Sequence, residues 1–194
     1  MRRGRLVAGL VVVALLVLLV SRVRFVAPGA KPPVATAPPP SGRAPAAGDT
    51  TLRIPVQGVA ATALHDDWGQ PRGDGDREHH AIDILAPKGT PVLAAASGTV
   101  EKRFESALGG HTLYVRTPDG ATVHYYAHLD TIGVPEGASV RQGQPIATVG
   151  DSGSAAGGPP HLHFEIKQMR PGEGWWQGTN IDPYPLLAGK PGRS

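Results

Sequence analysis

The hydrophobic and polar positions divide the chain into three stretches. Residues 6–20 form an uninterrupted run of fifteen apolar side chains with arginines on both sides. Between residues 27 and 50 proline, alanine and glycine dominate, and apolar positions show no period. From Leu52 onward, short apolar runs alternate with polar positions and are broken by Gly, Pro and Asp, a pattern that indicates β-strands joined by turns.

The third stretch predicts a mainly β fold with an antiparallel sheet. The turn sequence TPDG at residues 117–120 joins two strand-like runs into a hairpin. No repeat of fixed period and no amphipathic pattern of helix length is present. We therefore expect one domain over residues 51–190. Its strand-forming segments are TPVLAAA, GTVEKRF, HTLYVRT, ATVHYYAHL, QPIATVG and HLHFEIK.

The apolar run near the N-terminus indicates export. Its length lies between that of a signal-peptide core and that of a full membrane span. Arg22 and Arg24 follow the run, and no small-x-small cleavage site comes directly after it. This favours an uncleaved anchor within residues 1–25, held in the inner membrane by residues 6–20, over a cleaved signal and secretion. The arginines among the first five residues favour a cytoplasmic N-terminus, so the rest of the chain is expected in the periplasm.

Residues 26–50 cannot bury a core, because they are mostly proline, alanine and glycine. Such a composition predicts a semi-rigid spacer that extends by about 3 Å per residue, with a reach on the order of 70 Å. The segment is therefore expected to be a disordered linker that holds the following domain away from a membrane.

Composition and charge exclude several classes of function. The chain has no cysteine, so disulfides, thiolate metal sites and a cysteine nucleophile are excluded. Residues 1–50 hold seven Lys/Arg against one acid, a charge of +6, whereas residues 51–194 hold twelve against fifteen, a charge of −3. The predicted domain is mildly acidic, which argues against nucleic-acid binding.

Five residues in three separate segments form the candidate site. They are His79 and Asp83 in EHHAIDILAP, His128 in YYAHLD, and His161 and His163 in PPHLHFEI. In a chain without cysteine, two imidazoles and one carboxylate suit a three-ligand zinc site whose fourth position stays open for water. That arrangement is typical of catalytic rather than structural zinc.

The spacing of these residues sets conditions on the fold. His161 and His163 project from the same face of a strand, so one can bind metal while the other faces a substrate. In a straight strand His79 and Asp83 would be about 13 Å apart, too far to share an ion. The chain must therefore bend between them, with His79 at the end of the loop RGDGDRE and Asp83 at the beginning of the next strand.

Other polar residues near these motifs receive a structural interpretation. Glu165 shares a strand face with His163, but no HExxH helix accompanies it, so we interpret it as a supporting residue rather than a general base. His80 neighbours a candidate ligand and could line a cleft. The remaining histidines are interpreted as surface or hydrogen-bonded groups, as His80 is by default: His65, His111 and His124.

The order and spacing of the motifs resemble the lysostaphin-type (LytM-like) zinc endopeptidases. The match runs from DWG at residues 67–69 through HHAIDILAPKGTPVLAAASGTV, YYAHLD and VRQGQPIATVGDSGSAAGGPPHLHFEI to NIDPYPLL, which covers most of residues 53–188. The resemblance implies a β-sheet fold with a substrate groove, an extracytoplasmic location, zinc as cofactor, and peptidoglycan peptides as substrate for an endopeptidase.

The family pattern also implies a role for each residue of the candidate site. The zinc ligands would be His79, Asp83 and His163, and the catalytic residues would be His128 and His161. Either catalytic histidine could act as the base while the other stabilises the oxyanion, so their roles stay paired.

Two positions depart from the family pattern, and two other functions compete with hydrolysis. Ala81 stands where the family usually has glycine, and two prolines rather than one precede HLH. One competitor is a non-catalytic family member that binds peptidoglycan or regulates a cell-wall amidase; the intact ligand set argues against it. The other is a lipoyl- or biotinyl-like carrier suggested by GASVRQGQPIATVG, which lacks the lysine required at the hairpin tip. The residues predict no oligomeric state.

Overall fold

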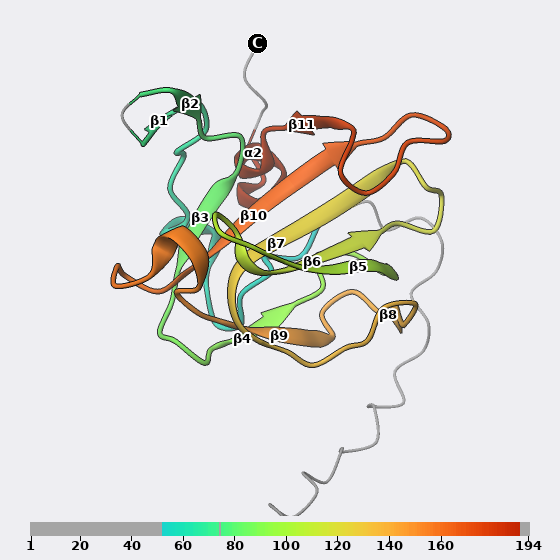
Figure 1. Ribbon diagram of the computed structural model, residues 1–194, viewed down its shortest axis with the longest axis horizontal. Helices are drawn as coiled ribbons and strands as arrows, with labels where there is room; N and C mark the ends of the chain where they lie inside the picture. The colour runs from blue at the N-terminus through green and yellow to red at the C-terminus, as the bar shows by residue number, and fades with distance from the viewer. Residues whose placement is uncertain (1–51, 74, 191–194) are drawn as a thin grey trace, which may run out of the picture. The chain divides into compact units, whose positions relative to one another are not determined.

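The computed structural model describes residues 52–73 and 75–190 (Figure 1). The apolar run at residues 6–20 and the spacer at residues 26–50 lie outside the described residues. Within the described part, no helix combines the length and apolar character needed to cross a membrane.

Strands dominate the described part of the chain, and the helical segments are short. The strands are β1 (Pro71–Arg72), β2 (Arg77–Glu78), β3 (Ile82–Leu85), β4 (Pro91–Leu93), β5 (Gly98–Ser106), β6 (Gly110–Arg116), β7 (Thr122–Ile132), β8 (Ser139–Val140), β9 (Pro145–Val149), β10 (His161–Gln168) and β11 (Thr179–Ile181). The helical segments are η1 (Ala61–Ala63), η2 (Gly153–Ala155) and α2 (Pro183–Ala188).

Nine strands form one antiparallel sheet, and β1 and β2 form a separate small hairpin. The main path runs β11-β10-β7-β6-β5-β8, and Figure 1 shows β10, β7, β6 and β5 side by side. Beside this path, β3 pairs with the first half of β10, and β9 joins the end of β7 to β4. Each of the six expected segments contains a strand, and the turn at residues 117–120 connects β6 to β7. The expected antiparallel β fold is therefore confirmed.

The alternation along β10 separates the core from the face that carries polar groups. Leu162, Phe164 and Ile166 are buried in the core, where they pack with residues of the neighbouring strands. His163 and Glu165 alternate with them and therefore lie on the opposite face. One face of the sheet consequently packs into the hydrophobic core, and the opposite face carries the polar side chains of the candidate site.

The short helix α2 is an element that the sequence pattern did not predict. Asp182 caps it by accepting a hydrogen bond from the backbone N–H of Tyr184, and Gly189 ends it with a left-handed φ of 63°. With only six residues, α2 cannot display the repeated apolar spacing by which longer helices are recognised.

Candidate metal centre and active site

Strand pairing brings the three predicted ligands together. In the β3–β10 pair, Asp83 lies directly opposite His163. His79 follows the end of β2 at Glu78, and the chain turns before β3 begins at Ile82. The bend expected between His79 and Asp83 is therefore present, and His79 reaches over the strand that carries Asp83.

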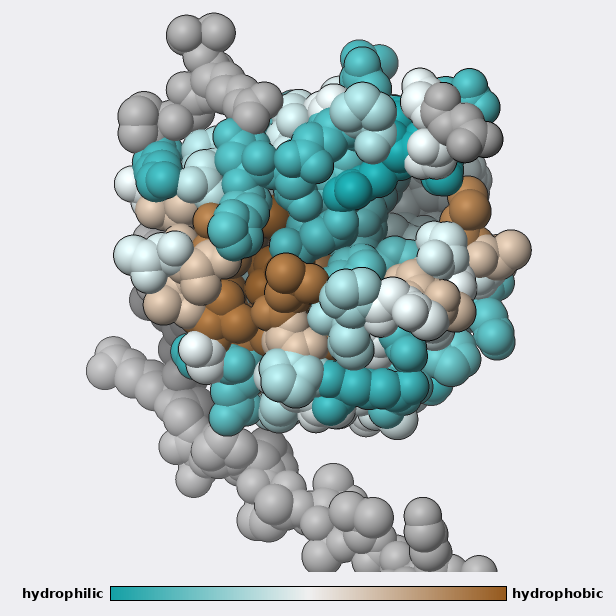
Figure 2. Space-filling model, turned by 90° about the vertical axis from the view of Figure 1, so that its left-hand side faces the viewer, coloured by the Kyte–Doolittle hydropathy of each residue, from teal (hydrophilic) through white to brown (hydrophobic). Residues whose placement is uncertain are grey.

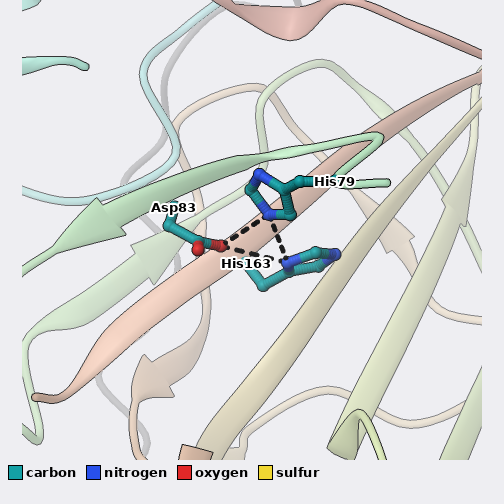
Figure 3. A group of neighbouring side chains, drawn as sticks. All are labelled: His79, Asp83 and His163. Atoms are coloured by element: carbon teal, nitrogen blue, oxygen red, sulfur yellow. Dashed lines mark hydrogen bonds and ion pairs between the residues drawn. The ribbon is translucent and has the colours of Figure 1, made fainter. Parts of the chain in front are cut away.

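Figure 3 shows the three side chains pointing at one another. His79 Nε2 lies 3.1 Å from both Asp83 Oδ1 and His163 Nδ1, and His163 Nδ1 lies 3.0 Å from Asp83 Oδ1. Ligand atoms in a tetrahedral zinc site with bonds of about 2.0–2.1 Å are separated by roughly 3.3 Å. The nearly equilateral triangle thus has the size that a tetrahedral cation with one open position requires.

Each histidine of this triad is oriented by a hydrogen bond from its other ring nitrogen. His79 Nδ1 donates to the backbone carbonyl of Asp67 at 3.1 Å, and His163 Nε2 donates to Glu165 Oε1 at 3.3 Å. Carbonyl and carboxylate oxygens only accept, so these contacts hold the N–H there and turn the lone pair of the opposite nitrogen toward Asp83. The side-chain amide of Asn180 donates a hydrogen bond to the second carboxylate oxygen of Glu165, Oε2, at 2.9 Å.

The electrostatics of the triad favour a positive charge at its centre. Burial opposes ionisation of Asp83, but protons on the facing ring nitrogens of His163 and His79, which occupy the centre when no cation does, outweigh it and hold the Asp83 pKa well below its ordinary value. Burial likewise disfavours charged His163, yet Asp83 and Glu165 together raise its pKa to about 9. Three electron-pair donors that face one another repel unless a cation lies between them. The donor set therefore fits zinc.

Arg72 and Asp67 complete the surroundings of Asp83. Arg72 Nη2 donates to Asp83 Oδ2 at 2.6 Å, and Asp67 Oδ2 accepts the backbone N–H of Asp83 at 3.2 Å. The Arg72 contact occupies Oδ2 and leaves Oδ1 facing the two histidines. Arg72 could not be recognised from the sequence, because it stands among charged residues that show no periodic or spacing signal.

His128 lies where β7 changes its partner strand. Ala127 still pairs with β10, whereas Leu129 pairs with β9. Among the described residues, His128 is the only non-glycine with a positive φ, at 58°, an outlier of the kind that clusters at functional sites. Its backbone N–H donates to the carbonyl of Gly109 at 2.8 Å, and its Nδ1 donates to the carbonyl of Ser152 at 2.9 Å.

The two remaining predicted residues face the triad with the same ring nitrogen free. His161 Nδ1 donates to the carbonyl of Pro159 at 2.9 Å, which leaves Nε2 as an acceptor, as in His128. His161 Nε2 lies 3.9 Å from Asp83 Oδ1, outside the triangle, and the rings of His128 and His161 are 4.9 Å apart. Burial lowers the pKa of His128 to about 4 against the opposing effect of Ser152, so its ring is neutral near pH 7.

A cleft of about 580 Å³ opens beside this cluster, with Asp83 and His161 in its wall. Its other walls come from the loop that contains η2 and from Arg72 and His65. Figure 2 shows the side of the molecule that carries β3 and η2, where a hydrophobic patch lies next to a band of hydrophilic residues. The site is thus open to a ligand that has both apolar and polar groups.

The four histidines outside the candidate site differ in their exposure and in their contacts. His80 is half-exposed and packs on Trp68 with its ring centroid 5.2 Å away, and His111 hydrogen-bonds the carbonyl of Asp130. His65 lines the cleft. His124 departs from the expectation of a surface or hydrogen-bonded group: it is 1% exposed, and its Nδ1 has no hydrogen-bond partner among the described residues. Its burial follows from its place on the core side of β7.

The antiparallel β fold and the His–Asp–His triad beside a cleft define a metallopeptidase-type site. The chain belongs to Peptidase family M23, because the sequence model of that family matches residues 77–183, more than half of the chain. The matched residues include all three residues of the triad and both of the histidines beside it.

Curated relatives carry the names of endopeptidases. The chain is 37% identical over 148 residues to the L-Ala-D-Glu endopeptidase of Bacillus subtilis, which covers 72% of this chain and 43% of the relative. It is 39% identical over 90 residues to the peptidoglycan DD-endopeptidase ShyC of Vibrio cholerae, covering 46% and 20%. The chain therefore spans less than half the length of these relatives.

Solved structures show the same fold. The catalytic domain of the antimicrobial peptidase lysostaphin from Staphylococcus simulans is 29% identical, with a TM-score of 0.54 over 64% of this chain and 90% of that one. LytU is 32% identical, with a TM-score of 0.54 over 64% and 83%.

Proposed function

We propose that this protein is a zinc-dependent endopeptidase that hydrolyses peptide bonds of bacterial peptidoglycan. The observation that carries the proposal is the triangle of ligand atoms in His79, Asp83 and His163, with sides of 3.0–3.1 Å. Two further histidines beside it, His128 and His161, each bond a backbone carbonyl through Nδ1 and turn Nε2 toward the site. A metal-assisted hydrolysis needs both parts: a three-ligand site with an open position, and groups that move protons next to it.

The positions of the five residues assign them two different roles, metal binding and proton transfer. His79, Asp83 and His163 would hold the ion, because their lone pairs converge. When bound, zinc supplies a Lewis acid that lowers the pKa of a water molecule and polarises the scissile carbonyl. His128 and His161 would accept the proton of the attacking water and deliver it to the leaving amine, since each holds its Nδ1 on a backbone carbonyl and directs Nε2 toward the triad. A protonated ring at either position also stabilises negative charge on the carbonyl oxygen.

The orienting contacts have a mechanistic consequence. Backbone carbonyls of Ser152 and Pro159 hold the N–H of the two proposed catalytic rings, so neither ring has to change tautomer before it accepts a proton. Glu165 does the same for the ligand His163. The proposed machinery is therefore oriented before substrate arrives, which lowers the cost of ordering it during the reaction.

The substrate class rests on the names of relatives. Both the Bacillus subtilis and the Vibrio cholerae relatives are named as endopeptidases, and the second is named for peptidoglycan. The first name specifies an L-Ala-D-Glu bond and the second a DD bond. Mass spectrometry of the products distinguishes cleavage within a stem peptide from cleavage of a cross-link.

The location is part of the same proposal. Residues 1–25 would anchor the chain in the inner membrane, the linker at 26–50 would act as a spacer, and residues 51–190 would form the peptidase domain in the periplasm. A relative named as the lipoprotein YgeR of Escherichia coli, 35% identical over 117 residues, supports a place in the cell envelope.

The experiment is a comparison of zinc content with soluble peptide release from purified peptidoglycan, using the full-length chain. We expect about one zinc per chain, release of soluble fragments, loss of release with a chelator, and recovery when zinc is restored. His161→Ala serves as the inactive control. A zinc-loaded protein that binds peptidoglycan and leaves it intact would favour the competing function, a non-catalytic regulator or binding protein.

A further inference from the structure

A row of aromatic side chains leads from the candidate metal centre across the same face of the sheet. Tyr125 meets the ring of His163 edge-on at 6.1 Å, and Tyr114 lies 4.6 Å from Tyr125. Trp175 packs on Tyr114 at 4.7 Å, and Trp176 packs on Trp175 at 5.4 Å. The triad is thus joined by continuous ring contacts to two tryptophans in the connection between β10 and β11, which Figure 1 shows beyond the end of β10.

Two hydrogen bonds and a glycine hold the loop around the tryptophans in a conformation that leaves Trp176 exposed to solvent. Arg116 Nη2 donates to the carbonyl of Glu173 at 2.9 Å, and Gln177 accepts the backbone N–H of Gly174 at 2.9 Å. A Cβ on Gly174 would collide with the indole ring of Trp176. The glycine therefore makes room for an indole that remains 64% exposed.

Exposed aromatic surface of this size indicates an interaction site, because burying a tryptophan side chain is strongly favourable. Phe104, 46% exposed, extends the surface by packing on Trp175 at 5.6 Å. The ion pair of Arg116 with Glu101 lies on this face as well, and Arg116 also donates to the carbonyl of Glu173 in the tryptophan loop. Flat apolar rings beside charged hydrogen-bonding groups match a sugar ring, which has C–H faces and a rim of hydroxyl groups.

We propose that Phe104, Trp175 and Trp176 form an aromatic platform that binds the glycan strand of peptidoglycan while an attached peptide enters the metal centre. The inference rests on the proposed function and adds the sugar chain as a second element of substrate recognition. Continuity with the triad through Tyr114 and Tyr125 places the platform on the face where the peptide would lie.

Charge favours a sugar over a lipid surface as the occupant. The residues around the platform carry both signs, with Arg116 bonded to Glu101 and Lys102 bonded to Glu136. A surface that binds anionic lipid head groups carries an excess of lysine and arginine instead. A neutral, hydroxyl-rich polymer requires no such excess.

The test compares cross-linked peptides still attached to glycan strands with the same peptides released from the glycan by an amidase and acetylated at the amine that the release exposes, so that the two differ only in the sugar. The full-length chain is used in a polyoxyethylene detergent, because sugar-based detergents would compete for the platform. We expect Trp176→Ala to lower kcat/KM for the glycan-attached substrate about 3- to 10-fold, mainly through KM, as loss of one stacked ring predicts. Cleavage of free peptides should stay unchanged.

Matched variants separate stacking from folding. Trp176→Phe should retain most of the preference for glycan, whereas Gly174→Ala, which displaces the indole without removing it, should lose it. Leu186→Ala removes an exposed apolar side chain of α2 and should change neither substrate.

Three outcomes would overturn the proposal. One is an equal loss on both substrates, and another is no change on either. The third is a Trp176-dependent retention on vesicles of phosphatidylglycerol and phosphatidylethanolamine with no effect on glycan, which would assign the platform to the membrane. If the wild-type chain cleaves neither substrate, the proposed function fails, and tryptophan fluorescence with peptide-free glycan strands still tests the platform.

Discussion

Substitution by alanine should divide the five site residues into two groups by zinc content. His79, Asp83 and His163 supply atoms that are 3.0–3.1 Å apart, whereas His161 Nε2 is 3.9 Å from Asp83 Oδ1 and its lone pair lies outside the triangle. Removing a ligand from the triangle leaves two. Removing His128 or His161 leaves the triangle complete, so zinc should stay bound.

The two groups should also differ in the size of their effects on zinc affinity and on turnover. Loss of a residue that only orients a ligand typically lowers metal affinity about 10- to 100-fold, so loss of a ligand should lower it by more than about 100-fold. General acid-base groups contribute about 100- to 10000-fold to rate, which corresponds to roughly 3–5 kcal/mol of transition-state stabilisation. His128→Ala and His161→Ala should therefore lose turnover by those factors at full zinc occupancy.

The assay measures zinc by mass spectrometry and fragment release from peptidoglycan on the same preparations of the wild type, the five alanine variants and one control, all as the full-length chain. His80→Ala is the matched control, because His80 neighbours a ligand in sequence while its ring packs on Trp68, away from the triad. It should keep both zinc and activity. The division into ligands and catalytic groups is wrong if His128→Ala or His161→Ala loses zinc as completely as His79→Ala.

Three other predictions address stability and location. Burial lowers the pKa of His124 to about 4 from an ordinary value of 6.5, so its stabilising effect is complete above pH 6.5 and is lost as pH falls toward 4. Between pH 7.5 and 5.0, thermal unfolding should show wild type losing about 2 kcal/mol more than His124→Leu, and equal losses would contradict this. Gly150→Ala should cost about 1–3 kcal/mol, because its Cβ would press on the backbone of Asp130 and His128, and it should reduce turnover by displacing His128. Gly133→Ala is the control, since its Cβ meets only an ordinary contact at 3.6 Å, and equal melting temperatures of the two variants would refute the reasoning. Sequencing of the mature N-terminus should find the start of the chain before residue 25, and a later start would show that the signal is cleaved.

Several features could be predicted from the sequence because they depend on local chemistry. Alternation in HLHFEIK separates Leu162 and Phe164, which are buried, from His163, because neighbouring residues on a strand point to opposite faces. The bend between His79 and Asp83 follows from strand rise alone, since a straight segment would hold the two too far apart to meet. The absence of cysteine by itself limits the metal ligands to histidine and carboxylate, because no thiolate is available.

Other features depend on strand register and on contacts between distant segments, and only the tertiary structure decided them. Asp83 faces His163 because β3 pairs with β10 in one register, and a shift by one residue would turn the carboxylate to the core. Arg72 in the small β1–β2 hairpin and Trp175 in the β10–β11 connection contact Asp83 and Tyr114, and the composition of neither segment indicates where it folds back. The positive φ of His128 likewise arises from hydrogen bonds to Gly109 and to residue 152, which lie 19 and 24 positions away along the chain. Periodicity reports which face of an element is buried, but it carries no information about which distant backbone that face will meet.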